Sequence, residues 1–325
     1  MIEEKGVDSV NQVEMKPEGI KIFNYSFFLS LVLVLPGTQW PLFFWVNGLI
    51  PLIVFLFLYG FGWKSGGRIL LAGVLIASAI GFFLQSLPLL LFSLTSFPAG
   101  FVLAHSAEKE EGQITAGLKG IVCLGVCGLL FWGGLMFTDD AFSYSGLIHQ
   151  VQLGIDAALD SYRNSASVPV DKLLEIDQLF NQAKLIFPII IPAIFGNLVI
   201  CTIWLAMLAG NRLALRFFGR CPWPEYKFWK LPEKLIWAAI VPALLVLVAD
   251  KTLQSVGINC LLLVSVIYVF QGIAILVFFC DKWKIPFFFR LPLYTIAVIQ
   301  SAGVLLLMIA GIADTWLDLR KMNKE

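Results

Sequence analysis

Charged residues are scarce in this chain. Only 14% of its 325 residues are Asp, Glu, Lys or Arg, whereas an ordinary soluble domain contains about 25%. Apolar residues make up 59% of the chain, and the mean hydropathy is +0.85. A soluble fold with this composition would expose a largely apolar surface. The composition therefore excludes a soluble enzyme and predicts an integral membrane protein that is embedded in the lipid bilayer.

Residue sets that carry known chemistry are also missing. The 23 basic and 22 acidic residues give a net charge of +1, so no basic surface for nucleic acid is expected. The two histidines and the absence of a CxxC pair leave too few ligands for a zinc site. The phosphate loop and the HExxH and GxSxG motifs are absent as well. We therefore expect no catalytic residue, no cofactor and no metal ligand, and interpret the chain as a protein that is not an enzyme.

Apolar runs dominate the rest of the sequence. A membrane-spanning helix needs about 20 apolar residues, and prolines at 36 and 41 divide the first long run into two. Nine segments result: 22–36, 42–61, 69–86, 87–105, 120–137, 185–210, 235–249, 256–280 and 291–313. The first and the seventh are short, so eight crossings remain an alternative to nine. The predicted fold class is all-α, a polytopic transmembrane helical bundle of eight or nine apolar segments.

The distribution of basic residues predicts the orientation. Residues 211–234 are rich in Lys and Arg, residues 138–184 are rich in Asp and Glu, and one apolar segment separates them. Cytoplasmic loops carry an excess of Lys and Arg, so we expect 211–234 and the N-terminus in the cytoplasm and 138–184 outside. The predicted location is the bacterial inner (plasma) membrane. Nine crossings would leave the C-terminal tail outside, and eight would leave it inside.

The same segments suggest the organisation of the chain. Residues 143–162 carry apolar side chains at i, i+3 and i+4 spacing, and a second helical pattern follows at 170–184; both are too polar to cross a membrane. We expect a polar N-terminal tail, an N-terminal transmembrane half, an outer amphipathic helical insert, a C-terminal transmembrane half and a polar tail. Their bounds are 1–21, 22–137, 138–184, 185–313 and 314–325.

No Lys, Arg, Asp or Glu falls inside the nine segments. Proton-coupled carriers, ion pumps and voltage sensors need ionisable groups within the membrane, so their absence argues against these classes. The polar candidates are amides. Asn197 follows Pro188 and Pro192, and both Asn197 and Gln271 adjoin a glycine. Buried amides of this kind form hydrogen bonds between helices, and Asn197 and Gln271 are in addition the candidates for lining a ligand site.

Small residues recur every four positions at Gly73, Ala77 and Gly81. They form one stripe of a helix, and small side chains allow helix backbones to approach closely in lipid. The stripe predicts close packing within the bundle or, alternatively, a docking face for a membrane partner subunit.

Three stretches carry a family resemblance: residues 226–237 (YKFWKLPEKLIW), 268–274 (YVFQGIA) and 311–321 (GIADTWLDLRK). In this order and spacing they resemble the YybS-like family of predicted bacterial membrane proteins, a domain of unknown function. That family is loosely similar to the substrate-binding subunits of energy-coupling-factor transporters. The likeness implies a helical bundle that binds a small molecule and docks on a partner. This chain is longer and carries the outer insert, which those subunits lack.

Two hypotheses follow. The first is a membrane-embedded small-molecule binding or transport subunit without its own energy source. It is based on the charge-free spans, the proline-containing segment before Asn197 and the family resemblance. The alternative is a structural or assembly factor of the bacterial cell envelope, based on the small-residue stripe and the outer insert. An internal cavity lined by Asn197 and Gln271 would favour the first hypothesis, and a solidly packed bundle the second.

Overall fold

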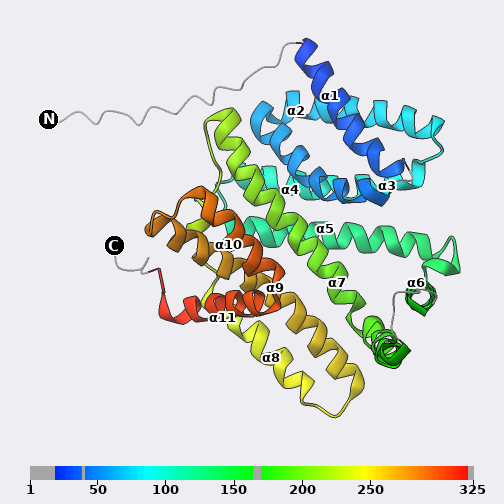
Figure 1. Cartoon of the computed structure of the whole chain (residues 1–325). Coiled ribbons are helices and arrows are strands. Elements are labelled where there is room, and N and C mark those ends of the chain that lie inside the picture. Colours follow the sequence, from blue (N-terminus) through cyan, green and yellow to red (C-terminus); the bar gives the residue numbers. More distant parts are fainter. Residues whose placement is uncertain (1–18, 39–40, 164–169, 321–325) are drawn as a thin grey trace. The chain divides into compact units, whose positions relative to one another are not determined.

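The computed structural model describes residues 19–38, 41–163 and 170–320 (Figure 1). Within these ranges the chain forms helices and no strand, as the predicted all-α class requires. The chain divides into two compact units. Unit 1 contains the residues up to Gly120 and Leu205–Pro222, and unit 2 contains Ile121–Trp204 and the residues from Trp223 onward.

Unit 1 is built from the N-terminal helices. Its elements are α1 (Gly19–Val34), η1 (Leu35–Gly37), η2 (Pro41–Leu49), α2 (Ile50–Phe83), α3 (Leu87–Leu94), α4 (Phe97–Glu108) and the first part of α5 (Gln113–Met136). The last part of α7 (Val170–Phe218) completes it. The aromatic ring of Phe218 packs over Gly60, where a Cβ would lie 2.0 Å from the ring. Glycine at this position is therefore required for α7 to pack against α2.

A sharp bend divides α2 at Gly62. This glycine has φ 75°, which only glycine adopts freely. A Cβ built on Gly66 would lie 2.4 Å from the carbonyl oxygen of Phe57. Residues nine positions apart in a straight helix are separated by about 13 Å along its axis. The chain therefore folds back at Gly62, and the two parts of α2 pack against each other.

The predicted small-residue stripe lies on the second part of α2. A Cβ on Gly73 would lie 2.7 Å from the side chain of Leu29 in α1, and Ala77 is fully buried. Gly81 is also buried and makes ordinary contacts with residues at the start of α3. The hydroxyl of Ser26 donates to the carbonyl of Ile69 at 3.1 Å. The stripe is thus buried inside unit 1, with Gly73 against α1 and Gly81 against the start of α3.

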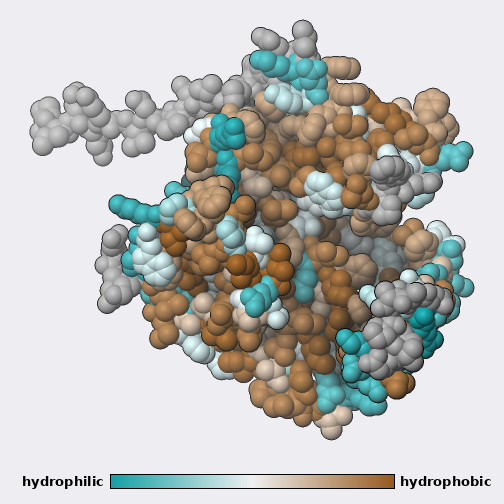
Figure 2. Space-filling view, in the orientation of Figure 1, coloured by the Kyte–Doolittle hydropathy of each residue, from teal (hydrophilic) through white to brown (hydrophobic). Residues whose placement is uncertain are grey.

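Unit 2 contains the rest of α5, most of α7 and the C-terminal helices. Its further elements are η3 (Asp140–Phe142), α6 (Tyr144–Arg163), η4 (Tyr226–Phe228), η5 (Glu233–Ile236), α8 (Trp237–Val246), α9 (Lys251–Lys282), α10 (Phe287–Ile299) and α11 (Ser301–Leu317). The predicted outer helix at 170–184 is not separate, because it continues into α7, a helix of 49 residues. Figure 2 shows polar side chains gathered around α6 and the start of α7, while apolar side chains cover most of α8 to α11 in this view.

The eight or nine spanning segments expected are not confirmed by the lengths of the helices. Five helices in the described ranges are long and apolar enough, or six if the bent pair α10–α11 is one span. Segments 22–36 and 235–249 fall in α1 and α8, which have 16 and 10 residues and are left out of this count for their length alone. Segments 42–61 and 69–86 are counted together as α2, although the chain folds back between them at Gly62, and segment 291–313 is interrupted at Gln300.

Gly73 and Gly67 provide a matched test of the contact between α1 and α2. Both lie in α2, but a Cβ on Gly67 meets nothing within 4 Å. Gly67→Ala should raise the stability of the fold by up to about 1 kcal/mol, because alanine favours a helix. Gly73→Ala should lower stability by about 1–3 kcal/mol, because Leu29 has to move. Thermal unfolding of the two purified variants measures both effects, and equal behaviour would contradict the close contact.

Candidate functional site

Helices α9 and α11 of unit 2 approach each other through two glycines. A Cβ on Gly272 would lie 2.0 Å from the carbonyl oxygen of Leu307, and a Cβ on Gly311 would lie 2.1 Å from that of Tyr268. Any side chain at either glycine would force the helices apart. This close approach places Gln271, beside Gly272, next to Asp314, one turn after Gly311.

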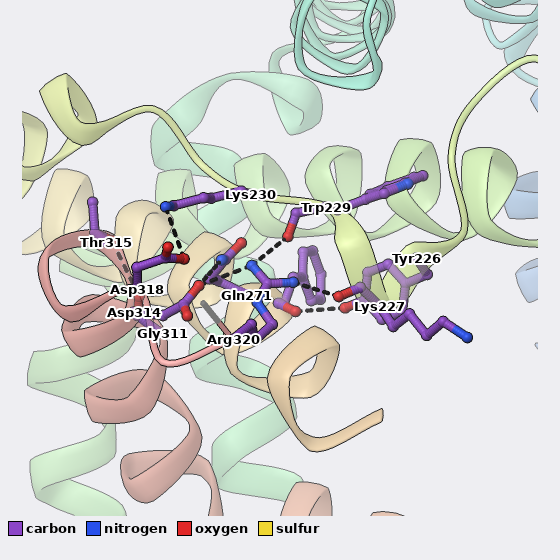
Figure 3. Close-up of polar contacts among 11 residues, drawn as sticks. Tyr226, Lys227, Trp229, Lys230, Gln271, Gly311, Asp314, Thr315, Asp318 and Arg320 are labelled. Atoms are coloured by element: carbon purple, nitrogen blue, oxygen red, sulfur yellow. Dashed lines mark hydrogen bonds and ion pairs between the residues drawn. The ribbon is translucent and has the colours of Figure 1, made fainter. Parts of the chain in front are cut away.

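The charge cluster, defined as Gln271, Asp314 and Arg320, is the most deeply buried polar group among the described residues of unit 2. An Arg320 nitrogen (Nη2) pairs with Asp314 Oδ2 at 2.8 Å, and neither side chain is exposed. The Gln271 amide (Nε2) donates to the same oxygen at 2.7 Å. Figure 3 shows these three side chains pointing toward one another. The carboxylate is thereby neutralised and hydrogen-bonded inside the helix pair.

The end of α11 returns Arg320 to Asp314. The helix ends at Leu317, and Asp318 adopts the left-handed conformation with φ 41°. Aspartate tolerates this conformation better than most residues. The chain turns there, so that Arg320 lies against the side chain six residues before it. The turn at Asp318 therefore completes the cluster.

The first resemblance segment covers the cluster. Arg320 donates to the carbonyl of Trp229 at 2.8 Å and also to the carbonyl of Lys227. The Tyr226 hydroxyl donates to the carbonyl of Phe270, whose ring stacks on Trp204 with 4.1 Å between ring centroids. One guanidinium thus joins α11 to the 226–229 segment, and the three resemblance stretches meet at this site.

A second set of charges lies at the edge of the cluster and is partly exposed. Lys227 pairs with Asp281 at 3.1 Å, and Lys230 pairs with Asp318 at 3.2 Å. Asp281 also pairs with Arg290. The hydrogen bond to Glu225, and next that to Asp281, raise the pKa of Lys227 above its ordinary value. Lys227 therefore stays charged and holds the end of α9.

Three buried polar atoms around the cluster have no hydrogen-bond partner among the described residues. They are Asp314 Oδ1, Arg320 Nε and the Tyr268 hydroxyl. Such atoms are costly in a dry interior. The arrangement can accept one further hydrogen bond at the carboxylate and donate one from the guanidinium. Among the described residues no three His, Cys, Asp or Glu side chains are placed to hold a metal ion.

Helix α11 extends beyond the charge-free segment 291–313 that the sequence predicts. The sequence pattern places Asp314 in a polar tail because the apolar run ends at residue 313. The helix continues to Leu317, and Asp314 is fully buried. The burial of Asp314 could have been predicted, because Asp314 follows Gly311 by one helical turn and lies on the same face of the helix. Its partner Arg320 could not be found in this way, because their pairing depends on the turn at Asp318.

Asn259 is a second polar residue that the sequence did not single out. Its amide nitrogen donates to the carbonyl of Ile189 at 2.7 Å, and its oxygen accepts from the backbone nitrogen of Ala193 at 2.8 Å. These are the two groups that would bond each other in an unbroken helix. Asn259 of α9 therefore occupies an opening in α7 between Ile189 and Ala193, next to Pro192.

The carbonyl of Pro188 is also occupied. Pro192, four residues later, has no N–H to donate to it, and the Tyr144 hydroxyl donates instead at 2.6 Å. The proline-containing region that suggested an internal pocket near Asn197 is therefore closed by side chains from α6 and α9.

The structure does not bring the two predicted ligand-lining amides together. Asn197 is half-buried and its amide contacts the carbonyl of Leu262 at 3.4 Å. Leu262 and Gln271 are nine residues apart on α9, or about 13 Å along its axis. A pocket of about 460 Å³ lies on α10 and includes neither amide; it is lined by Phe287, Phe288, Leu291, Pro292, Thr295 and Ile296.

The buried ion pair predicts strong non-additivity. Arg320→Met should cost about 3–5 kcal/mol, because it leaves Asp314 charged and buried without its partner. The double variant Asp314→Leu/Arg320→Met should cost less than Arg320→Met alone. Lys230→Gln is the control, since it removes a partly exposed pair worth about 1 kcal/mol or less. Unfolding of wild type, both single variants of the pair and the double variant gives the coupling energy, and additive effects would contradict the pairing.

Asn259 and Asn197 provide a comparison of two amides. Asn259→Leu leaves two backbone groups of α7 without partners and should destabilise by about 1–3 kcal/mol. Asn197→Leu removes one weak interaction and should cost about 0.6 kcal/mol. Thermal unfolding under identical conditions checks the order. If Asn197→Leu were the more harmful change, Asn259 would not be the residue that stabilises the opening in α7.

Comparison with known proteins identifies the family of the chain. No curated protein and no solved structure matches it closely enough to show a relationship. The family described as "Predicted membrane protein (DUF2232)" matches residues 28–315, which include Gln271 and Asp314. This match carries neither the YybS-like name nor the likeness to transporter subunits. Because it covers most of the sequence, the chain belongs to the DUF2232 family of predicted membrane proteins.

Proposed function

We propose that this chain is a membrane-embedded small-molecule binding or transport subunit without its own energy source, and that the charge cluster is its functional centre. The observation that carries the proposal is the fully buried Asp314–Arg320 pair with unused hydrogen-bonding atoms on both partners. An ionisable group buried among membrane helices is expensive, and such groups commonly mark substrate or ion pathways.

The unused atoms suggest the chemistry of the ligand. Asp314 Oδ1 can accept a hydrogen bond, while Arg320 Nε can donate one. A small polar molecule that carries both a donor and an acceptor would satisfy the two groups. The 226–229 segment lies over Arg320 through two carbonyl contacts, so ligand entry would require this segment to move away from α11.

A partner would have to supply energy for transport. The sequence lacks a phosphate loop, so nucleotide hydrolysis by this chain is not expected. The resemblance to energy-coupling-factor binding subunits supports the same arrangement, in which this chain binds the small molecule and a partner supplies the energy. We therefore extend the proposal to a membrane partner subunit in the bacterial inner membrane, with the N-terminus of this chain in the cytoplasm.

The second candidate is a structural or assembly factor of the cell envelope. Asn259 closes the opening in α7, and Gly73 and Ala77 are used in packing within unit 1. Polar and small residues that were candidates for contact with a ligand or a partner thus make contacts within this chain. These observations favour a packed scaffold, and a ligand test separates the two candidates.

Co-purification decides between them. The full chain is purified from its native membrane, and bound small molecules are identified by mass spectrometry. Wild type should carry a polar small molecule, and Gln271→Leu should reduce its occupancy at least about tenfold, as expected for the loss of 1.4 kcal/mol or more. The Gln271 amide bonds Asp314 directly, so its loss disturbs the proposed centre while the ion pair remains.

The matched control is Asn47→Leu, which removes another buried amide, one that accepts a hydrogen bond from Ser93 in unit 1. This variant should keep the ligand. Thermal unfolding of the same samples shows whether each variant is folded. An empty wild-type protein, or full occupancy in folded Gln271→Leu, would contradict the binding function and favour the structural candidate.

A further inference from the structure

Helices α10 and α11 meet at a break that allows two topologies. The pair is bent by 94° at Gln300, and the helices have 13 and 17 residues. Each is shorter than the roughly 20 residues that cross the hydrocarbon core. As one broken span, the pair would begin and end on opposite sides of the membrane. As a re-entrant pair, it would begin and end on the same side.

The start of α10 is tied to the 227–230 segment. Arg290 donates to the carbonyl of Ile285 at 2.7 Å and also to Asp281, the penultimate residue of α9. Asp281 is in turn paired with Lys227 at 3.1 Å. The chain that leaves α9 and enters α10 is therefore fixed beside Lys227.

The end of α11 is tied to the same segment. Lys230 pairs with Asp318 at 3.2 Å, and Arg320 donates to the carbonyls of Lys227 and Trp229. Four residues extend over at most about 14 Å, which is half of the roughly 30 Å hydrocarbon core. Lys227 itself contacts both ends, through its ammonium group and through its carbonyl oxygen.

We propose that α10 and α11 form a re-entrant pair that enters the membrane beside the 227–230 segment, turns at Gln300 and leaves on the same side. This inference goes beyond the proposed function and does not depend on it. In Figure 1 the start of α10 and the end of α11 both lie toward the left of the view. The turn is tight, since a Cβ on Gly303 would lie 2.6 Å from the carbonyl of Ala297.

The re-entrant pair fixes the side of the C-terminus. The end of α11 with Arg320 lies on the side of the 227–230 segment, and Lys321 and Lys324 follow Arg320 in the sequence. Basic residues then collect on one side, as the distribution of Lys and Arg in membrane proteins requires. A tail on the opposite side would separate Arg320 from the loop carbonyls to which it donates.

Accessibility of the full chain tests the proposal. Cys221 is exposed in the loop before η4, and an epitope tag is added after Glu325. Intact cells and inverted vesicles are treated with a membrane-impermeant maleimide or with protease, and Cys221 labelling is located by peptide mass spectrometry. Cys221 should be labelled, and the tag cleaved, in the same preparation. Cleavage of the tag from the opposite side would overturn the re-entrant pair.

A second measurement locates the start of α10. In a full chain whose six natural cysteines are replaced by alanine, Lys282→Cys and a cysteine after Glu325 are labelled separately. Lys282 is exposed. Both cysteines should react from one side, and Gly154→Cys on α6 should react from the other. Reaction of the first two from opposite sides would overturn the proposal, whatever the ligand experiments show.

Discussion

The ion pair between Asp314 and Arg320 is the interaction on which the C-terminal part of unit 2 depends. Gly272 and Gly311 bring α9 and α11 so close that the Asp314 carboxylate lies in a dry contact, where a charge without a partner would cost several kcal/mol. Arg320 neutralises it, and its two terminal nitrogens also donate to two carbonyls of the 226–229 segment. One side chain therefore joins segments that are about ninety residues apart in sequence.

The sequence predicted the features of the fold that depend on residues close together in the chain. Composition and apolar run length indicated a helical membrane protein, because burial in lipid needs little besides continuous apolar helix. The four-residue spacing of Gly73, Ala77 and Gly81 indicated a close helix contact, and this stripe does pack inside unit 1. Gln271 stands out in the sequence for its adjacent glycine, and it lies in the charge cluster.

The parts that could not be predicted depend on long-range contacts. The bend at Gly62 depends on a positive φ angle, and the break at Gln300 depends on packing. A hydropathy pattern predicts neither feature. Asp314 was missed because α11 continues beyond its apolar run. Asn259 was missed because its role is to bond two backbone groups of another helix. The prolines of α7 indicate an opening in that helix, but they do not indicate which residue fills it.

The charged side chains of unit 2 fall into a partly exposed set and a fully buried pair, and the free-energy cost of removing them from water differs between the two. The Lys227, Lys230, Asp281 and Asp318 side chains are 20–35% exposed, so water and lipid headgroups can solvate them cheaply. The Asp314–Arg320 pair has no exposure. Apolar residues of similar volume often replace such a pair without loss of stability. The contacts of Arg320 with two carbonyls account for its part in the fold, and the unused acceptor and donor atoms of the pair give the proposed ligand-binding role a physical basis.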